Sequence, residues 1–250
     1  MLDADSIIFD FEDAVPEGAK SAARDLLQKL LKELEWDPER ELCVRINKKS
    51  PDLYSQEDLD AVKGLDKISS IILPKIENRA SKIHEYTGKR LQGLVETAKG
   101  LINVAEIAES KGMVALSFGP QDYANSVRGD VSSYSSNQGV IATMVAAARA
   151  NDLDPVDGVY FELGNLEGFR TASTFARKMG CAGKQVVHPA QIPVANEVFS
   201  PTAQEVSEAI RIVEVYEKAG ENNTGALRLD DRLIDAVHYR HAKDLLSRVQ

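Results

Sequence analysis

The sequence has little cysteine, no long apolar run and no excess of positive charge. Its 250 residues include two cysteines, Cys43 and Cys181, which lie far apart and form no Cys-x-x-Cys pair. We therefore expect two reduced, buried thiols in a cytosolic protein. No apolar run approaches the roughly 18 residues that a membrane-spanning helix needs. The first residues, 1–5, resemble neither a signal peptide nor a transit peptide. These absences predict a cytoplasmic protein with no membrane partner.

The balance of charge argues against a nucleic-acid partner. Lysine and arginine number 30, aspartate and glutamate number 39, and the formal net charge is −9. An acidic chain repels nucleic acid and anionic membranes. A local Arg or Lys can still dominate a cleft, so a small anionic substrate remains possible. Hydrophobic residues make up 43% of the chain, which allows a sizeable core.

Several familiar motifs are absent. The sequence contains no Gly-x-Gly-x-x-Gly turn, no phosphate-binding P-loop and no Gly-x-Ser-x-Gly nucleophile elbow. It also contains no Cys/His cluster suited to zinc. These absences argue against a Rossmann domain, a P-loop nucleotide site, a serine hydrolase and a zinc site.

A repeated unit organises the chain: a short apolar strand, a charged residue at its C-terminal end, and an amphipathic helix. The first strand covers 6–11 and is followed by carboxylates, before a helix that opens at Pro16. Further strands are expected at 41–46, 69–73, 91–95, 113–118, 157–161 and 184–187. Helices are expected near 17–35, 55–63, 77–87, 99–111, 139–151, 165–179, 191–197 and 202–219, with a polar, irregular active-site loop at 125–138.

Seven such units predict an α/β fold with parallel strands and right-handed crossovers. An open doubly wound sheet and a (β/α)₈ barrel both fit this alternation. We favour the TIM (β/α)₈-type barrel, because the strand ends are rich in proline and the dinucleotide-binding turn is missing. Seven units are one short of a barrel, so the usual first strand is the one we expect to be lacking.

The C-terminal segment differs in character from the rest. We expect residues 1–219 to form the barrel domain and residues 220–250 to form a hinge with a C-terminal lid helix. The hinge is the stretch 220–225, and a charged element at 227–235 leads into a helix that ends near 248. The segment is either a lid that reaches a neighbouring subunit or a surface helix that caps the domain. Hinge composition leaves both open.

In a barrel the C-terminal ends of all strands meet on one face, which holds the active site. Each expected strand here ends in a charged or polar residue. Because strand ends are polar in any protein, each of these residues also has a structural alternative. The candidates are Glu12, Asp13, Arg45, Lys75, Glu96, Asp122, Glu162 and His188.

Glu96 and Asp122 are the strongest pair, because they end adjacent strands. Two carboxylates with positions left open for water suit Mg²⁺. The alternative is a pair of solvated or salt-bridged carboxylates. Arg45 has the geometry to grip a substrate carboxylate in bidentate fashion, or to pair with Glu12 or Asp13.

Lys75 and His188 each leave two interpretations open. Lys75 is either a Schiff-base lysine, as in a class I aldolase, or a charged partner for carboxylates or phosphate, and we favour the second. His188, which stands beside Pro189, is either a base or a structural or binding contact, and we favour the second.

Six motifs together resemble one family. The sequence resembles the citrate lyase β-subunit-like family, within the wider HpcH/HpaI aldolase and citrate lyase group, from about residue 2 to 237. The motifs are Phe-Asp-Phe-Glu-Asp-Ala-Val (9–15), Val-Arg-Ile-Asn (44–47), Leu-Pro-Lys-Ile-Glu (73–77), Val-Glu-Thr-Ala (95–98), Phe-Gly-Pro-Gln-Asp-Tyr (118–123) and Val-His-Pro-Ala-Gln (187–191).

The resemblance implies a homotrimeric, Mg²⁺-dependent carbon–carbon lyase with a TIM barrel. Its substrate would be a 3-hydroxyacyl-CoA thioester such as malyl-CoA or citramalyl-CoA. The products would be acetyl-CoA and a keto acid such as glyoxylate or pyruvate. The alternatives are the citryl thioester lyase subunit of a citrate lyase complex, an aldolase on free hydroxy-keto acids, and an inactive, truncated paralogue.

The resemblance also implies residue roles. Glu96 and Asp122 would be the Mg²⁺ ligands, and Arg45 would hold the substrate carboxylate. Glu12 and Asp13 would line the catalytic site through hydrogen bonds and metal-bound water.

Further roles concern substrate binding and the lid. Lys75, Pro120 and His188 would bind substrate, with His188 near the CoA end. Residues 233–235 match a Met-Ile-Asp-like motif of the family, so Asp235 would be the acid/base, delivered by the lid of an adjacent protomer.

Two departures from the family pattern stand out. Relatives begin with a further strand of the Arg-Ser-x-Leu-x-x-Pro type before the stretch that corresponds to 2–5. Either the barrel is incomplete, another element fills the gap, or the recorded start is too late. A missing strand would leave two unpaired sheet edges. In addition, the lid has Asp-Asp-Arg at 230–232 where relatives often have Asp-Gly-Lys, which alters the expected lid geometry.

Overall fold

The computed structural model describes residues 2–133, 135, 137–220 and 226–249. The chain divides into two compact units, Met1–Glu197 and Val198–Gln250. No helix in the described part of the chain combines the length and apolarity needed to cross a membrane.

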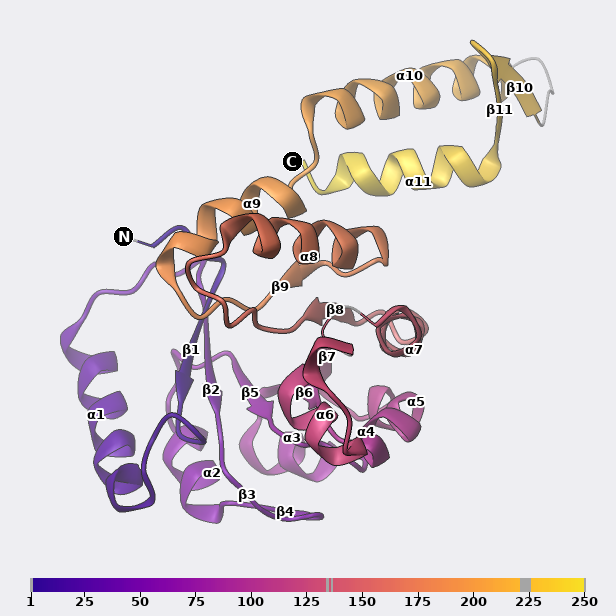
Figure 1. Ribbon diagram of the computed structural model, residues 1–250. Coiled ribbons are helices and arrows are strands. Elements are labelled where there is room, and N and C mark those ends of the chain that lie inside the picture. Colours follow the sequence, from indigo (N-terminus) through magenta and orange to yellow (C-terminus); the bar gives the residue numbers. More distant parts are fainter. Residues whose placement is uncertain (1, 134, 136, 221–225, 250) are drawn as a thin grey trace. The chain divides into compact units, whose positions relative to one another are not determined.

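The first unit is built on a curled sheet of seven parallel strands, which forms a half-barrel (Figure 1). Among the described residues, the first and last strands in this order each pair with a single neighbour, so the sheet has two edges. The strands, in spatial order, are β1 (Ser6–Asp10), β2 (Glu41–Arg45), β5 (Ser70–Leu73), β6 (Arg90–Val95), β7 (Met113–Phe118), β8 (Asp154–Asp157) and β9 (Gly183–Lys184).

The connecting helices lie outside the curve of the strands (Figure 1). A small hairpin, β3 (Lys48–Ser50) with β4 (Leu53–Tyr54), follows β2. Short 3₁₀ turns cover Glu17–Ala19, Val131–Ser133 and Pro189–Gln191. The helices are α1 (Lys20–Glu33), α2 (Gln56–Lys63), α3 (Ser81–Thr87), α4 (Ala98–Ile102), α5 (Val104–Ala108), α6 (Pro120–Val127), α7 (Gln138–Arg149), α8 (Leu166–Lys178) and α9 (Ile192–Phe199).

The central strands are apolar because both faces of the sheet are covered there. All four residues of β5 are buried, and Val44 in β2 and Leu116 in β7 are fully buried as well. Parallel sheets with helices packed on them have strands of this near-continuous hydrophobic type. The edge strand β1 is less covered, and its Ile8 remains 40% exposed. The predicted α/β class and the barrel-type curvature are confirmed.

The two cysteines are free thiols and both are buried. Burial raises the pKa of Cys43 to about 11 and that of Cys181 to about 12, so neither is a thiolate near neutral pH. The expectation of reduced, buried thiols is confirmed.

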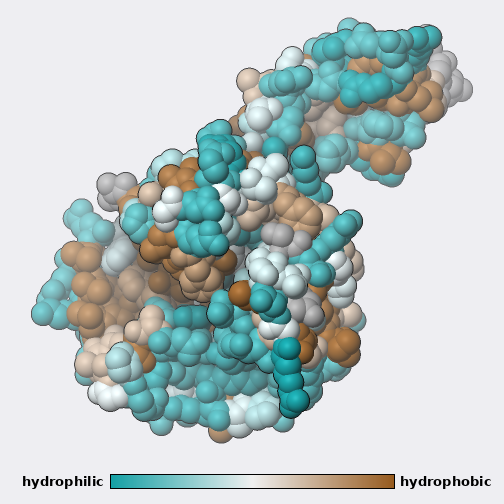
Figure 2. Space-filling view, viewed as in Figure 1, coloured by the Kyte–Doolittle hydropathy of each residue, from teal (hydrophilic) through white to brown (hydrophobic). Residues whose placement is uncertain are grey.

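Much of the face of the first unit drawn in Figure 2 is hydrophilic. Hydrophobic residues nevertheless gather at the edge over α1 (Figure 2). Leu26 within this helix is 54% exposed, and Leu34 at its C-terminal end is 48% exposed. This edge presents apolar surface next to β1.

The second unit contains two antiparallel strands and two long helices. Its hairpin, β10 (Ala226–Leu229) with β11 (Arg232–Asp235), is the charged element expected at 227–235. The helices are α10 (Ala203–Gly220) and α11 (Ala236–Ser247). The rings of Tyr216 and Tyr239 stack with centroids 4.8 Å apart, which joins the two helices.

This arrangement differs from the division at residue 219 that composition had indicated. Helix α10 packs against α11 and the hairpin, so it belongs with the C-terminal segment, and the boundary lies at 197/198. The expected hinge covers 220–225, of which 221–225 lie outside the described residues.

The predicted sixth and seventh strands were placed wrongly. The sixth strand covers 154–157 instead of 157–161, and its short sequence, Asp-Pro-Val-Asp, lacks an apolar run. The apolar stretch that follows has no strand pairing. There the chain passes close to the end of β7. The approach is so close that a Cβ on Gly158 would come within 2.1 Å of the Phe118 carbonyl oxygen. The seventh strand is confined to 183–184.

The predicted helix at 99–111 is two short helices, α4 and α5, with a break at Asn103. The Asn103 side-chain amide donates to the Glu77 carbonyl oxygen at 2.8 Å, which ties this break to the segment after β5. The irregular stretch expected at 125–138 contains the end of α6 and a 3₁₀ turn.

A buried ion pair joins the last two strands. The Lys184 ammonium contacts the Asp157 carboxylate and donates to the Gly158 carbonyl oxygen at 2.7 Å. Their side chains are 3% and 4% exposed. Burial raises the pKa of Asp157, even though Lys184 acts in the opposite direction. With only two residues in β9, this pair is a main tie between the edge strand and the sheet.

We expect Asp157→Asn to lower the free energy of unfolding by about 3 kcal/mol, because it leaves the Lys184 ammonium buried and unpaired. Thermal unfolding followed by circular dichroism measures the effect. Asp154→Asn is the matched control on the same strand, because its carboxylate is 67% exposed and meets Arg149 at the surface. Equal melting temperatures for both variants would contradict the structural importance of the buried pair.

Candidate active site

Charged side chains converge at the carboxyl ends of the strands, around a cavity of about 240 Å³. Five of the residues predicted for the site line it, and they come from the ends of β1, β2, β6 and β7. These five are Asp13, Arg45, Glu96, Pro120 and Asp122, and the wall also includes Leu94, Phe118, Gly119, Gln121, Val159, Phe161 and Gln185.

Arg45 is held from two sides. Its Nε and Nη2 atoms donate to the two carboxylate oxygens of Asp10 at 2.7 and 2.6 Å, a bidentate pair. Its Nη1 lies 3.2 Å from Glu12 Oε2. Asp10 and Arg45 are register partners on neighbouring parallel strands, which places the two side chains together. The predicted pairing with Glu12 is present, whereas the dominant partner, Asp10, was not predicted.

Asp10 keeps its charge because of this contact. Burial acts to raise the pKa of Asp10, but the hydrogen bonds and the charge of Arg45 hold it below its usual value. The arginine is therefore oriented by a carboxylate that stays ionised at neutral pH. Two of its five N–H groups are used in this way.

Lys75 bridges several carboxylates. Its Nζ donates to Glu12 Oε1 at 2.6 Å and lies 3.4 Å from Asp13 Oδ2 and 3.8 Å from Asp122 Oδ2. Burial opposes the charge, but Glu12, Glu96 and Asp122 outweigh it and raise the pKa of Lys75. A Schiff-base lysine must be neutral to attack, so this environment favours the interpretation of Lys75 as a charged partner.

The backbone at Lys75 is left-handed, with φ at 51°. This conformation costs a non-glycine residue roughly 1–2 kcal/mol. It directs the Lys75 backbone N–H at Glu96 Oε1, 2.8 Å away, while the side chain reaches Glu12. The strained residue thus links two carboxylates of the site.

Glu96 is the most perturbed acid at the cavity. It is 3% exposed, and its pKa is raised to about 8, chiefly by burial and also by the negative charges of Asp122 and Glu12, although Lys75 acts in the opposite direction. Gly119 allows this packing, because a Cβ there would lie 2.3 Å from Glu96 Oε2.

Glu12 combines burial with an unused acceptor. It is 6% exposed, and burial raises its pKa although Lys75 and Arg45 act against the shift. Its Oε2 atom accepts no hydrogen bond, even though Arg45 Nη1 is near it. The geometry of that contact makes it an ion pair and not a hydrogen bond.

The donor set suits a hard cation. Glu96 and Asp122 are carboxylates of one cavity, and the negative charge of Asp122 raises the pKa of Glu96. A cation between them would relieve this repulsion. Among the described residues, no three His, Cys, Asp or Glu side chains are grouped so as to hold a metal ion. Glu96 and Asp122 offer a pair of carboxylates, and Mg²⁺, which retains several waters, suits such a pair.

Three predicted residues are placed elsewhere. His188 is exposed and does not line the cavity; its Nδ1 accepts from the Ala190 backbone N–H at 3.1 Å and caps a 3₁₀ turn. Glu162 lies in the loop after β8, where its carboxylate accepts from Asn165 at 2.9 Å. Asp235 belongs to the second unit and caps α11.

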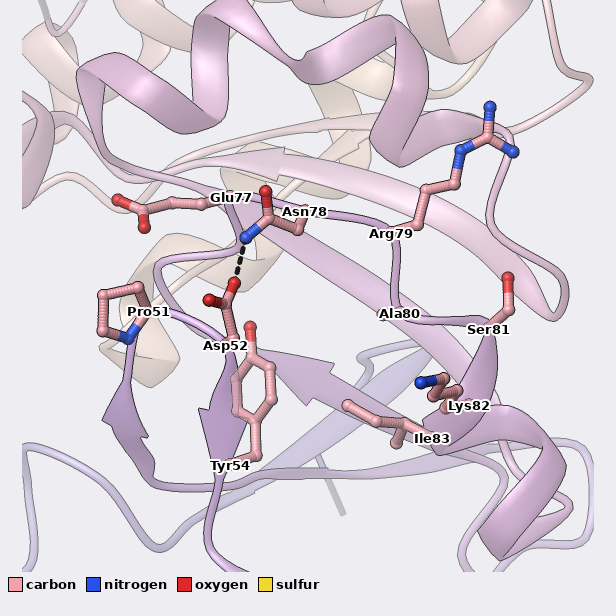
Figure 3. Close-up of a pocket in the computed structure, with 10 residues that line it drawn as sticks. All are labelled: Pro51, Asp52, Tyr54, Glu77, Asn78, Arg79, Ala80, Ser81, Lys82 and Ile83. Atoms are coloured by element: carbon pink, nitrogen blue, oxygen red, sulfur yellow. Dashed lines mark hydrogen bonds between the residues drawn. The ribbon is translucent and has the colours of Figure 1, made fainter.

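A larger cavity of about 410 Å³ lies beside the β3–β4 hairpin. Figure 3 shows the Asn78 amide donating to Asp52 there, with Tyr54 below this contact. Glu77, also in its wall, pairs with Lys48 at 3.5 Å. None of the predicted site residues lines this cavity, so the candidate site is the smaller one, where the charged strand ends meet.

We expect the stability of the metal-free protein to depend on Glu96. Its pKa of about 8 in the folded protein is above its usual 4.5, so the folded protein holds a proton that the unfolded chain has lost between these values. The free energy of unfolding therefore falls as pH rises through this window, by at most about 1.4 kcal/mol per pH unit.

Glu96→Gln cannot ionise, so its free energy of unfolding should fall less than that of the unmodified protein between pH 5.5 and 8. Urea unfolding without divalent cations measures the difference. Glu85→Gln, on the exposed side of α3, is the control and should behave as the unmodified protein. The same slope in all three proteins would contradict the raised pKa of Glu96.

The chain is similar to known proteins of one family. Residues 1–189 match the HpcH/HpaI aldolase/citrate lyase family. The (3S)-malyl-CoA thioesterase of Cereibacter sphaeroides (strain ATCC 17025) is 33% identical, over 100% of this chain and 88% of that protein. The L-malyl-CoA/beta-methylmalyl-CoA lyase of Rhodobacter capsulatus is 29% identical, over 99% of this chain and 88% of the lyase.

A solved structure is similar over nearly the whole chain. It is that of CitE from Mycobacterium tuberculosis in complex with magnesium, acetoacetate and coenzyme A. It has 29% sequence identity and a TM-score of 0.79, and the match covers 98% of this chain and 90% of CitE. With the family match over residues 1–189, these relationships show that the chain belongs to the HpcH/HpaI aldolase/citrate lyase family.

Proposed function

We propose that this chain is a Mg²⁺-dependent carbon–carbon lyase that cleaves or forms a 3-hydroxyacyl-CoA such as malyl-CoA or citramalyl-CoA. Cleavage gives acetyl-CoA and a keto acid, glyoxylate or pyruvate. The observation that carries the proposal is the single cavity in which the Glu96 and Asp122 carboxylates lie with Arg45. The names of the relatives and the magnesium and coenzyme A of CitE support this substrate class.

Glu96 and Asp122 would hold the Mg²⁺ ion. When bound, the ion supplies positive charge that polarises the oxygen of the keto-acid part. Glu96 must lose its proton to serve as a ligand. The Lys75 ammonium lies 3.8 Å from Asp122 Oδ2 and would help to orient that carboxylate.

Arg45 binds the substrate carboxylate. The Asp10 clamp fixes the plane of the guanidinium, so donors left on its Nη atoms can meet a carboxylate without losing side-chain freedom on binding. Lys75 adds positive charge beside the cavity, 3.8 Å from Asp122 Oδ2, and Pro120 gives this end of the cavity a fixed shape.

The proton balance of cleavage follows from the substrate. A base takes the hydroxyl proton, the C–C bond breaks, and its electron pair passes to the thioester α-carbon. The resulting enolate takes up a proton to give acetyl-CoA. Glu12 and Asp13 would line the site near the hydroxyl, and burial, which raises the pKa of Glu12, favours its role in proton transfer.

Asp235 supplies the proton at the α-carbon from the hairpin unit of a neighbouring copy. Its carboxylate accepts from the backbone N–H groups of Val237 and His238 at 2.9 and 3.3 Å, which fixes its orientation. The flanking Leu233 and Val237 side chains are 67% and 60% exposed. Such apolar flanks suit burial against another surface.

In a homo-oligomer, which the family resemblance implies to be a trimer, this segment would reach the cavity of a neighbouring copy. The exposed apolar side chains over α1 give further surface for such an assembly. His188 would bind the CoA end, and we propose a cytoplasmic location.

Thioester hydrolysis is the second candidate function, because the relative at 33% identity is a (3S)-malyl-CoA thioesterase. Hydrolysis leaves the C–C bond intact and releases malate and CoA. The citryl thioester lyase of a citrate lyase complex, an aldolase on free hydroxy-keto acids and an inactive paralogue remain as further alternatives, each with its own product pattern.

We expect purified protein with malyl-CoA or citramalyl-CoA to release acetyl-CoA and a keto acid when Mg²⁺ is present, and not with EDTA. Asp122→Asn should lower Mg²⁺ affinity at least tenfold, measured by calorimetry, and should lower the lyase rate with it. Asp25→Asn, exposed on α1, is the control.

Chromatography of the products separates the candidates. Malate with CoA would establish the thioesterase in place of the lyase. Turnover of free hydroxy-keto acids alone would establish the aldolase. Turnover of a citryl thioester only with an added acyl-carrier protein would indicate the citrate lyase subunit, and no turnover of any of these by folded protein would indicate an inactive chain.

We expect active-site complementation between copies. Asp235→Asn and Arg45→Met should each lose about 10²-fold or more of the lyase rate. Co-expressed in one cell, the two variants should recover a fraction of it, because mixed oligomers contain a cavity with both residues intact. Recovery should be absent when each variant is assayed alone. No recovery in mixed oligomers would place Asp235 over the cavity of its own chain or outside catalysis.

A further inference from the structure

A buried polar network lies behind the cavity and does not line it. Its centre is Asp58 on α2, which is 0% exposed. The Asp58 carboxylate accepts from Arg24 Nη1 at 2.7 Å, from the Asn47 backbone N–H at 2.8 Å and from Asn47 Nδ2 at 2.7 Å. It therefore fixes both the backbone and the side chain of the residue that follows β2.

The network reaches the loop that carries the acidic residues. Asn47 Nδ2 also donates to the Phe11 carbonyl oxygen at 2.8 Å. Lys20 Nζ, from the first turn of α1, donates to the carbonyl oxygens of Phe11 and Glu12 at 2.9 and 3.1 Å and to Asn47 Oδ1 at 2.5 Å. The backbone on which Glu12 stands is thus held by side chains from outside the cavity.

This backbone position decides the place of the Glu12 side chain. One carboxylate oxygen meets the Lys75 ammonium at 2.6 Å, and the other accepts no hydrogen bond. The Glu12 carboxylate has one hydrogen bond, from Lys75, and one ion pair, with Arg45 at 3.2 Å, and both contacts require the main chain to place Glu12 between these two cations.

The cost of the network indicates a purpose beyond folding. The Lys20 side chain is 12% exposed and that of Asp58 is 0% exposed. Burying charges often costs as much as their attraction returns, and apolar packing of similar volume is frequently as stable. The buried charges of Lys20 and Asp58 are better explained by the fixed backbone geometry that their hydrogen bonds impose.

We propose that Lys20 and Asp58 are positioning residues, which act through the backbone of residues 11 and 12 to hold Glu12 between Lys75 and Arg45. The expected change in rate rests on the proposed lyase function of the cavity. The expected change in the position of Glu12 does not. A displacement of about 1 Å in such a site can cost about 10²-fold in rate.

Two variants test the network from two helices. Lys20→Met removes three donated hydrogen bonds and keeps the aliphatic stem. Asp58→Asn keeps the shape of the side chain and removes its charge. The matched controls are Lys29→Met on α1, whose ammonium is 65% exposed, and Asp60→Asn on α2, which is also exposed.

The first measurement does not need enzyme activity. Acetic anhydride labels neutral amines, and mass spectrometry of peptides reports the labelling rate of Lys75. If Glu12 loses its place, Lys75 loses its partner and its pKa falls. A fall of half a pKa unit raises the neutral fraction about threefold. We expect at least this increase in both variants, a similar or larger one in Glu12→Gln, and none in the controls.

The second measurement is a double-mutant cycle on the lyase rate. Lys20→Met should lower kcat about 10²-fold with little change in KM. In the Glu12→Gln background it should lower kcat no further, because Lys20 acts through Glu12. The loss of thermal stability from Lys20→Met should be the same in both backgrounds.

Several outcomes would overturn the inference. Unchanged labelling of Lys75 in both variants would do so, as would kcat losses that add in the double variant, since these indicate a general structural role. If both variants lack a cooperative thermal transition, the network serves folding alone. If the unmodified protein cleaves no thioester, the proposed function fails, and the labelling result still decides the positioning role separately.

Discussion

An imbalance of charge governs the candidate site. The carboxylates of Asp10, Glu12, Asp13, Glu96 and Asp122 face two cations, Arg45 and Lys75, within one small region. Glu12 and Glu96 are buried, so water screens their charges little, and the pKa values of both are raised. A cavity of this kind repels the carboxylate of a keto acid unless a divalent cation joins it. The same excess of negative charge therefore explains why Mg²⁺ and an anionic substrate would bind together.

The backbone supplies the geometry that this charge distribution needs. Parallel register puts Asp10 beside Arg45, and the left-handed Lys75 turns its N–H to one carboxylate and its ammonium to another. Gly119 leaves room for Glu96. The Lys75 backbone is in an unfavourable conformation, and Gly119 allows an unusually close approach. Each of these features lies next to a charged group of the cavity. Strain of this type persists only where the surrounding structure over-determines it.

Sequence patterns could predict the residues at strand ends, because βα repeats bring those ends together whatever the helices do. Arg45, Glu96 and Asp122 follow apolar runs and were found in this way. The patterns could not locate β8, since Pro155 and its flanking aspartates do not resemble a strand. They also could not assign α10 to a unit, since the apolar stripe of this helix would suit packing against the first unit or the second equally well. Lys20 and Asp58 were missed for another reason. Both lie on amphipathic helices, where a charge appears exposed until the three-dimensional contacts reveal what lies against it.

The distribution of charge also bears on which bond breaks. In the proposed lyase, Arg45 and Lys75 would meet the keto-acid end of a hydroxyacyl thioester. Loss of the hydroxyl proton develops negative charge on the oxygen at that end, which these two cations would stabilise before the electron pair passes to the thioester α-carbon. Hydrolysis develops charge at the thioester carbonyl and needs an attacking water there. In this proposal the positive charge of Arg45 and Lys75 serves the keto-acid end and therefore supports the lyase, even though four similar proteins carry the hydrolytic name.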